Sequence, residues 1–373
     1  MNDVDHPASV PGLTIEGCKR RQDRLRRSLQ ERDLDAALIC DRRHVHYLTG
    51  YWHRSLFAPA VLIRRDGQAT LSAPLPVEGE AAADETIVYE SNRLGTLVDD
   101  QLAAATRAIQ DRLEGLGRIG CDAPVPRALL SHFDTAGIED LTGDLLAMRR
   151  RKDPDELALL RFTIAAAEAA YQYALEVLEP GRTEVELFAG MQAAAADYVG
   201  ETLGEFGNDF QIGAAGSPPR RRRAQLGEVA IFDLSVVVRG YSCDMCRSFV
   251  VGGRPSAAQI EAHQRVMEVQ KLVVEQARPG ASCAALYEDA RAMLEGYRGW
   301  AFPHHLGHGI GLCAHEAPRL NPHWDDTLRV GDVFTAEPGL YGDDLRAGVR
   351  VEEIYHVSES GVEKLTSFPI EIG

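Results

Sequence analysis

Two aspartates in one hydrophobic stretch are the first candidates for chemistry. Asp233 and Asp244 lie in EVAIFDLSVVVRGYSCDMCRSFVV, where two β-branched runs flank Arg239-Gly240. This pattern predicts a β-hairpin with a two-residue turn. That register puts Asp233 opposite Cys246 and on the same face as Asp244, with the two aspartates roughly 7–8 Å apart at the backbone. Two carboxylates on one face of an apolar hairpin are costly unless a cation lies between them.

The same hairpin has a simpler interpretation, in which it faces solvent and carries two ordinary surface acids. The aspartates alone do not choose between the two interpretations. Cys243 and Cys246 form a C-x-x-C within the hairpin. Three residues apart on one strand, they point to opposite faces, so a disulfide or a shared metal is not expected there. We expect both to be small packing residues.

A second group of polar residues follows in HHLGHGIGLCAHE, residues 304–316. Its glycines allow another backbone to approach closely without steric cost. A lone buried histidine is usually structural, but four within twelve residues favour a functional site. These four are His304, His305, His308 and His315.

Two glutamates lie in strand-like segments near the C-terminus. GDVFTAEPGLYG predicts a strand in which Glu337 shares a face with Thr335, and Pro338 ends the pairing. In GVRVEEIYHV, strand alternation places Glu352 and Glu353 on opposite faces. A glutamate on the face of a core strand is unusual as packing and natural as a ligand.

Charge arithmetic connects these segments. Asp233, Asp244, Glu337 and Glu352 carry four negative charges, which two divalent cations would balance. With one neutral histidine they make a mostly oxygen shell, which suits Mn²⁺, Co²⁺, Fe²⁺ or Zn²⁺. Two such ions about 3.5–4 Å apart can share a hydroxide and polarise the attacked group. The sequence therefore predicts a site for two divalent metal ions, with Mn²⁺ as the first choice.

Composition limits the setting in which this site works. The 373 residues are 45% hydrophobic and 26% charged, which predicts a globular protein of two domains. A net charge of −16 disfavours nucleic acid as a partner. No apolar run approaches the roughly 18 residues of a membrane helix, and no secretory signal is visible. Seven scattered cysteines fit a reducing compartment, so we expect a cytoplasmic protein.

The first half of the chain alternates between strand and helix patterns. We expect strands in DAALIC, in TIVYE, in GRIGCD and on both sides of the Asp-Gly turn in APAVLIRRDGQATLSAP, and a loop in DRRHVHYLTGYW. Helices are expected over 16–33, 96–114 and 125–136. This alternation predicts a small α/β domain. The charged segment RRRKDPD, residues 149–155, marks the domain junction.

The second half opens with well-marked helices. Asp153 is a predicted N-cap with Pro154 at the first helical position. Two capping boxes predict further helix starts, one at Thr183 with Glu186 and one at Ser256 with Gln259. Another helix is expected over 283–295, and strands and loops over 301–373.

Taken together, these residues resemble the pita-bread metallopeptidases, the group of methionine aminopeptidase, aminopeptidase P, prolidase and creatinase. ERDLDAALICDRRHVHYLTGYW and the linker MRRRKDPDELALLR resemble the prolidase and creatinase type, whose N-terminal domain the simple methionine aminopeptidases lack. The resemblance implies a creatinase/prolidase-like α/β N-terminal domain over residues 1–148. It implies an α+β pita-bread catalytic domain over residues 149–373.

The resemblance also implies roles for single residues. The metal ligands would be Asp233, Asp244, His308, Glu337 and Glu352. His315 would hydrogen-bond substrate and steady the tetrahedral intermediate, and Glu337 would double as a proton shuttle. His304 would line the substrate pocket, and Arg350 would support the last ligand. The predicted catalytic residues are thus His315, Glu337 and His304, and the predicted substrate-binding residues are His304, His315 and Arg350.

The chain departs from the family pattern at one informative place. Prolidases, aminopeptidase P and creatinase carry a substrate-binding or catalytic histidine upstream of the first aspartate ligand. The corresponding stretch here reads QIGAAGSPPRRRRAQLGE, and no histidine occurs between His132 and His263. The arginines Arg220 to Arg223 could bind an acidic substrate or could belong to a solvated loop.

Three functions follow from the resemblance. The first is a dinuclear metallohydrolase acting as an Xaa-Pro dipeptidase or Xaa-Pro aminopeptidase on short peptides. The second is a hydrolase or lyase of the same fold acting on a small non-peptide, as in the ectoine-hydrolase, creatinase or dimethylsulfoniopropionate-lyase types, which the missing histidine favours. The third, a non-catalytic binding protein, is disfavoured by the intact ligand set. The resemblance also implies a homodimer, with Tyr51 to Arg54 as the loop that could reach across or simply pack.

Overall fold

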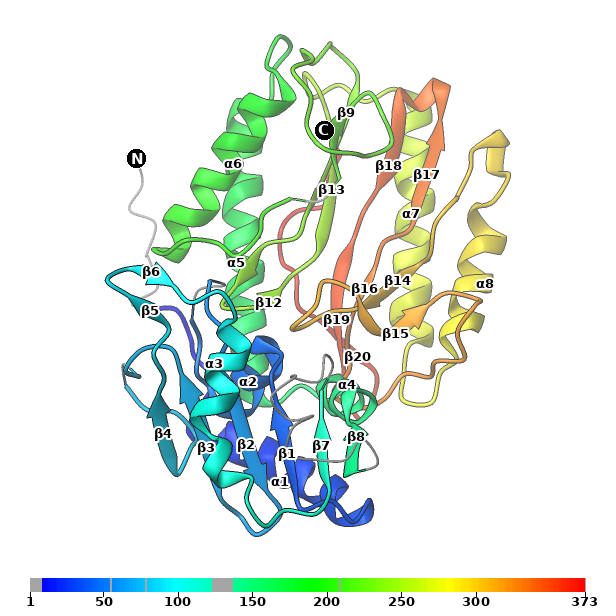
Figure 1. The fold of residues 1–373 in the computed structure, drawn as a ribbon. Coiled ribbons are helices and arrows are strands. Elements are labelled where there is room, and N and C mark those ends of the chain that lie inside the picture. The colour runs from blue at the N-terminus through cyan, green and yellow to red at the C-terminus, as the bar shows by residue number, and fades with distance from the viewer. Residues whose placement is uncertain (1–8, 54–55, 78, 123–136, 208, 373) are drawn as a thin grey trace. The chain divides into compact units, whose positions relative to one another are not determined.

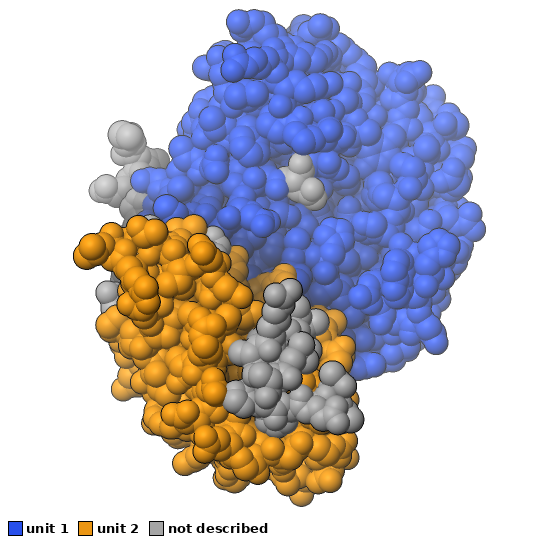
Figure 2. Space-filling view, in the orientation of Figure 1, with its two compact units in different colours: residues 1–11, 150–373 blue, residues 12–149 orange. Residues whose placement is uncertain are grey.

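The computed structural model describes residues 9–53, 56–77, 79–122, 137–207 and 209–372. These residues form two compact units, coloured separately in Figure 2. One unit comprises residues 12–149, and the other comprises residues 150–373 together with the described N-terminal residues 9–11. The helix expected over 125–136 lies outside the described residues, as does Arg54 of the proposed intersubunit loop.

The unit of residues 12–149 is built on a mixed sheet with strand order β4-β3-β2-β1-β7-β8. The strands are β1 (Ala36–Ile39), β2 (Ala60–Arg64), β3 (Ala69–Ala73), β4 (Glu85–Val88), β7 (Ile119–Cys121) and β8 (Ile138–Asp140). Among the described residues, four α-helices accompany it, α1 (Ile15–Glu31), α2 (Arg42–Thr49), α3 (Gln101–Ala108) and α4 (Thr142–Arg150), of which α4 ends at the unit boundary. The strands expected in DAALIC, in TIVYE, in GRIGCD and around the Asp-Gly turn are all present.

Two expectations in this unit are wrong. DRRHVHYLTGYW is not a loop, because α2 occupies most of it. The Asp41 side chain accepts a hydrogen bond from the backbone N–H of Arg43, and Gly50 ends the helix at a φ of 74°. The helix expected over 96–114 is shorter, since β5 (Asn92–Arg93) and β6 (Thr96–Leu97) pair as a hairpin before it. Only α3 and the short 3₁₀ helix η1 (Gln110–Arg112) follow.

The larger unit has two helix pairs, with α5 (Pro154–Val177) against α6 (Glu184–Val199) and α7 (Ala257–Gln276) against α8 (Cys283–Leu294). All four lie close to the predicted positions. Asp153 caps α5 with Pro154 at its start, and the two predicted capping boxes are present at α6 and α7. In Figure 1 the strands of this unit run between the green pair α5–α6 and the yellow pair α7–α8.

These strands form several small sheets. One has the order β13-β10-β9, with β9 (Phe210–Ile212), β10 (Val229–Leu234) and β13 (Met245–Val250). A second has the order β15-β14-β16-β19-β20, with β14 (Gly307–Gly309), β15 (Glu316–Leu320), β16 (Val333–Ala336), β19 (Glu353–Val357) and β20 (Val362–Lys364). Two ribbons complete the set, β11 (Val237–Val238) with β12 (Tyr241–Ser242) and β17 (Gly339–Gly342) with β18 (Ala347–Arg350). Helices α7 and α8 cover this framework through a buried apolar cluster that includes Val266, Leu286 and Phe334.

The hairpin of the two aspartates has the predicted register. Asp233 pairs with Cys246 across β10 and β13. The turn residues Arg239 and Gly240 have φ values of 46° and 83°, the left-handed conformation that a type I′ turn requires. Cys243, like Cys246, is free and buried, as expected for packing residues.

Candidate metal centre and substrate cavity

The predicted acids converge at the middle of the larger unit. Asp233, near the end of β10, and Asp244, just before β13, each offer an oxygen to a group completed by Glu352. The three ligand atoms lie within 4.8 Å of one another. Glu352 is held there because its backbone N–H donates to the carbonyl of Cys246. The bland interpretation of the hairpin, with two solvent-facing acids, is therefore wrong, since Asp233 is 3% and Asp244 1% exposed.

His308 reaches the same place from a strand that its flanking glycines allow to pack tightly. A Cβ on Gly307 would lie 1.9 Å from the carbonyl oxygen of Thr335, and one on Gly309 would lie 2.2 Å from that of Ala317. Only glycine fits both positions. The strand β14 can therefore lie close to its neighbours and project His308 into the site.

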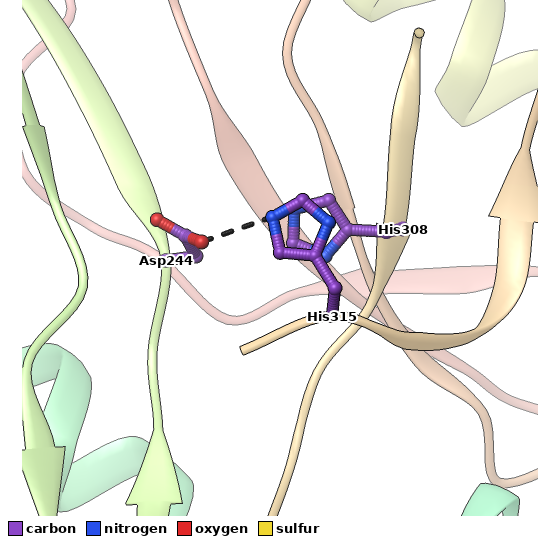
Figure 3. A group of neighbouring side chains, drawn as sticks. All are labelled: Asp244, His308 and His315. Carbon is purple, nitrogen blue, oxygen red and sulfur yellow. Dashed lines mark ion pairs between the residues drawn. The ribbon is translucent and has the colours of Figure 1, made fainter. Parts of the chain in front are cut away.

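The imidazole of His308 lies near both Asp244 and Glu337. Its Nε2 lies 3.8 Å from Oδ2 of Asp244 and 3.6 Å from Oε1 of Glu337. His308, Glu337 and Glu352 form a second group with potential ligand atoms within 4.8 Å of one another. Figure 3 shows His308 facing Asp244, with the ring of His315 stacked on it at a centroid distance of 3.6 Å. The structure thus brings together all five residues predicted as ligands.

Several oxygens in this cluster lack partners. Both carboxylate oxygens of Glu352 and the Oδ1 atoms of Asp233 and Asp244 are buried and accept no hydrogen bond from the described residues. The Thr335 hydroxyl acts to lower the pKa of Glu352, but it does not donate a hydrogen bond to either carboxylate oxygen. A buried carboxylate oxygen without a partner is costly, so such oxygens on three carboxylates in one place, with the buried Glu337 beside them, call for cations. The donor set, four carboxylates and one imidazole, fits divalent metal ions.

The electrostatics of the cluster lead to the same conclusion. Burial, with repulsion from Glu352, raises the pKa of Asp244 well above its usual range. Burial and repulsion from Asp233 raise the pKa of Glu337 well above its usual range. Burial and repulsion from Glu337 do the same to the pKa of Glu352. Burial and the neighbouring His315 hold the pKa of His308 well below its usual value, which favours the neutral imidazole that binds metal. Divalent cations would relieve the repulsion among these carboxylates.

A cavity of about 310 Å³ opens beside the cluster. Besides the five predicted ligands, it is lined by three further histidines, by other polar residues and by a short glycine-containing wall. These residues are His304, His305, His315, Tyr341, Arg350, Asp209, Pro303, Ala215 and Gly216. Among the polar lining residues, Asp209, His305 and Tyr341 were not predicted as site residues, nor were the wall residues Pro303, Ala215 and Gly216. Of these, His305 belongs to the predicted histidine cluster, whereas Asp209 and Tyr341 carry no spacing signal of their own.

His304 lines the cavity with both ring nitrogens engaged. Its Nδ1 lies 2.8 Å from the carbonyl oxygen of His305, to which it donates, and its Nε2 lies 2.9 Å from the Tyr341 hydroxyl. Burial lowers the pKa of His304 to about 3, so the ring is neutral and Nε2 accepts from Tyr341. His304 thus fixes the orientation of the tyrosine in the cavity.

The guanidinium of Arg350 forms ion pairs with two carboxylates at the site. Its Nη2 lies 2.8 Å from Oδ2 of Asp233 and 3.1 Å from Oδ2 of Asp209. The contact is therefore with the first predicted ligand and with an acid outside the predicted set, rather than with Glu352. Arg350 itself is 5% exposed, so both pairs are shielded from solvent on the arginine side.

Most of the arginine-rich loop is engaged in contacts within the chain. Arg220 pairs with the buried Glu184 at 2.6 Å, and Arg222 pairs with Glu228. The Arg223 side chain donates to the carbonyl of Gly181, whereas Arg221 is exposed. None of the four is among the described residues that line the cavity. Most of this loop therefore has a structural role.

Residues 158–359, more than half of the chain, match the family model of metallopeptidase family M24. The chain belongs to metallopeptidase family M24. Residues 21–150 match the Creatinase/Prolidase N-terminal domain, so this M24 protein also has the predicted N-terminal domain. Membership of a metallopeptidase family implies divalent metal ions, in agreement with the donor set found here.

Individual relatives cover nearly the whole M24 chain. It is 28% identical to a Pyrococcus horikoshii protein named Xaa-Pro dipeptidase, across 92% of this chain and 96% of the relative. The solved prolidase of Pyrococcus horikoshii superposes with a TM-score of 0.77 at 24% identity, covering 95% of this chain and 100% of that one. An Escherichia coli aminopeptidase P variant gives a TM-score of 0.77 at 19% identity, covering 96% and 97%. The predicted fold, a creatinase/prolidase-type domain followed by a pita-bread catalytic domain, is confirmed.

Within the described ranges, no helix is both long enough and apolar enough to cross a bilayer.

Proposed function

We propose that this M24 family member is a dinuclear metallohydrolase that cleaves Xaa-Pro bonds in dipeptides or short peptides. The observation that carries the proposal is the convergence of four buried carboxylates, three of them with unpartnered oxygens, on His308 beside a cavity. Relatives named Xaa-Pro dipeptidase, matched over almost their full length, support the substrate class.

The metal ligands in this proposal are Asp233, Asp244, His308, Glu337 and Glu352. The ions would be two divalent cations, Mn²⁺ in the first instance, with Co²⁺, Zn²⁺ or Fe²⁺ as alternatives. When bound, they would supply an activated water at neutral pH and polarise the scissile carbonyl.

Other cavity residues would complete the reaction. Glu337 accepts a proton from the attacking water and passes it to the leaving proline nitrogen. His315, at the cavity surface, donates a hydrogen bond to the developing oxyanion. His304 acts through Tyr341, and Arg350 holds Asp233 in its ligating position. Each of these side chains lines the cavity, so substrate can reach them together.

The proposal is tested with Mn²⁺-reconstituted protein, a panel of Xaa-Pro dipeptides and Xaa-Pro-Yaa tripeptides, and metal analysis of the same sample. Hydrolysis confined to proline-containing peptides is expected, and the accepted chain length separates dipeptidase from aminopeptidase activity. Asp244→Ala should abolish both metal binding and turnover, whereas Asp343→Ala, at an exposed residue outside the cavity, should change neither. If the Asp244→Ala variant binds two metals and keeps full turnover, Asp244 does not belong to the site.

One observation favours a second candidate, a hydrolase or lyase of the same fold that acts on a small non-peptide. The cavity wall at Ala215 and Gly216 carries no imidazole, and the chain has no histidine between His132 and His263. Two bound metals without cleavage of any peptide in the panel would favour this candidate. The search would then move to small C–N and C–S substrates.

The wider setting is part of the same proposal. We propose a domain division between residues 148 and 149, a homodimer and a cytoplasmic location. The Creatinase/Prolidase N-terminal match at residues 21–150 supports the division. The free cysteines among the described residues fit a reducing compartment.

A further inference from the structure

The side chain assigned to the oxyanion has few contacts that hold it in place. His315 lies in the irregular segment 310–315, between β14 and β15. Within the described part of the chain its imidazole makes no hydrogen bond or ion pair, and its ring contacts are with His305 and His308. The placement of His315 in the cavity therefore depends on what holds the two ends of this segment.

One buried lysine lies against both ends. Nζ of Lys152 donates to Oε1 of Glu316 at 2.6 Å, and the two side chains are 1% and 7% exposed. At the other end, a Cβ on Gly311 would lie 3.1 Å from Nζ of Lys152 and 2.8 Å from Oε1 of Glu316. A glycine at position 311 thus leaves room for the ion pair. The segment that carries His315 begins and ends beside this pair.

The backbone of Lys152 is itself fixed. Lys152 comes directly before Asp153, the N-cap of α5, and its backbone N–H donates to the carbonyl of Gly331 at 3.0 Å. Consecutive residues of an extended chain point to opposite sides, so a contact that holds Glu316 against Lys152 directs His315 the other way. The cavity lining agrees, because among the described residues it includes His315 and not Glu316.

A buried ion pair is weak evidence of added stability. The cost of taking two charges out of water is close to the attraction between them, and apolar residues of similar volume are often as stable in their place. Stability alone therefore does not explain a buried lysine at this position. The contact of Lys152 with the residue next to His315 offers another explanation.

We propose that Lys152 is a positioning residue, which holds His315 through Glu316 so that the imidazole can donate to the developing oxyanion. The role of His315 in this inference rests on the proposed function. The way in which its ring is held does not, because it follows from contacts within the chain.

The first test replaces the ion pair with apolar side chains, in Lys152→Met/Glu316→Leu, and measures hydrolysis of Ala-Pro by the Mn²⁺-reconstituted protein. The Tm should stay close to that of the wild type. The value of kcat should fall about 10- to 100-fold with little change in KM, because the weakened hydrogen bond forms only in the transition state. The matched control, Arg161→Met/Glu363→Leu, replaces an exposed ion pair and should keep the wild-type kcat.

The same replacement in a His315→Ala background separates positioning from a general structural role. Without the imidazole there is nothing left for Lys152 to position, so kcat should fall by less than about twofold further. A loss of equal size in both backgrounds would overturn the proposal. A wild-type kcat in Lys152→Met/Glu316→Leu would overturn it as well.

Nuclear magnetic resonance tests the proposal even if no peptide is cleaved. In metal-free protein with ¹³C-labelled histidine, the Cε1–H signal of His315 is identified by its absence from His315→Ala. Stacking on His308 should displace this signal from the position of a free histidine in the wild type. It should return towards that position in Lys152→Met/Glu316→Leu and, to a smaller extent, in Glu316→Gln, a milder variant in case the double variant does not fold. An unchanged signal in the folded variants would overturn the proposal, whereas a changed signal without peptide cleavage would count only against the proposed function.

Discussion

Glu352 and Glu353 are adjacent in the chain and equally buried, at 1% exposure each, but they have opposite surroundings. Glu352 faces the cavity, and neither of its oxygens has a hydrogen-bond partner among the described residues. Glu353 points the other way. Its Oε2 accepts from Nη2 of Arg247 at 3.0 Å and from the Thr366 hydroxyl, and its Oε1 lies 3.3 Å from Nζ of Lys364.

The difference shows how to separate a binding site from a structural ion pair. Arg247 matches Glu353 with a fully used guanidinium, which also donates to the carbonyl oxygens of Cys246, Glu352, Phe368 and Pro369. A buried charge with such partners stabilises one conformation of the chain. A buried charge without them, as at Glu352, calls for a cation as its partner. Burial alone does not distinguish the two.

The largest effect is expected when Glu352, the glutamate without hydrogen-bond partners, is changed. Glu352→Gln should lower kcat on an Xaa-Pro dipeptide by about 10³-fold, because a bound metal contributes several kcal/mol to transition-state stabilisation. Metal analysis of the same sample should show fewer than two ions per chain. Full activity with two ions bound would remove Glu352 from the site.

The same variant gives a pH signature in metal-free protein. Burial and repulsion raise the pKa of Glu352 in the folded state, so the folded state binds the proton more tightly than the unfolded state. Its contribution to stability therefore falls as pH rises above the unfolded value of about 4.3. We subtract the Tm of metal-free wild type from the Tm of metal-free Glu352→Gln. This difference should increase between about pH 5 and pH 8. The cavity histidines are present in both proteins and cancel in this difference, and a constant difference would contradict the repulsion.

A change at Glu353, the glutamate with partners, should lower stability and leave metal binding unchanged. Glu353→Gln leaves Arg247 buried without its counter-charge, which should lower the free energy of unfolding by about 3–5 kcal/mol. Denaturant unfolding at fixed Mn²⁺ measures this loss. Metal content at saturating Mn²⁺ should stay at the wild-type value. Loss of metal at unchanged stability would mean that Glu353, and not only Glu352, belongs to the metal centre.

The smallest effect concerns the wall of the cavity that lacks an imidazole. Ala215→His places a histidine at a residue that lines the cavity and should raise kcat/KM on Xaa-Pro dipeptides by up to about tenfold, the value of one hydrogen bond. Arg221→His, on the same loop but exposed and outside the cavity lining, should change nothing. An increase in the second variant instead of the first would mean that the loop adopts another position during catalysis.

Much of the site could be predicted from the sequence because its residues follow strong local rules. The Arg239-Gly240 turn set the register that joins Asp233 to Asp244, and the glycines around His308 indicated a close approach of strands. Capping residues located α5, α6 and α7 correctly. In each case the signal lies within a few residues of the feature.

What could not be predicted depends on contacts between distant segments. The pairing of Arg350 with Asp209 spans 141 positions, and no local sequence pattern around either residue predicts it. The arginines Arg220 and Arg222 looked like a free basic loop because their partners, Glu184 and Glu228, are ordinary acids in the sequence. The helix α2 was missed because the short charged segment that forms it resembles a turn, and only its caps reveal it.

The central claim, that the unpartnered carboxylates hold two divalent ions, is tested most directly by counting the ions. Dialysed wild-type protein is titrated with Mn²⁺, and the bound metal is measured by mass spectrometry alongside a circular dichroism spectrum. Two ions per chain are expected for the wild type and for the Asp343→Ala control, with fewer for Glu352→Gln. A folded wild-type protein that binds no Mn²⁺, Co²⁺, Zn²⁺ or Fe²⁺ at saturation would contradict the claim.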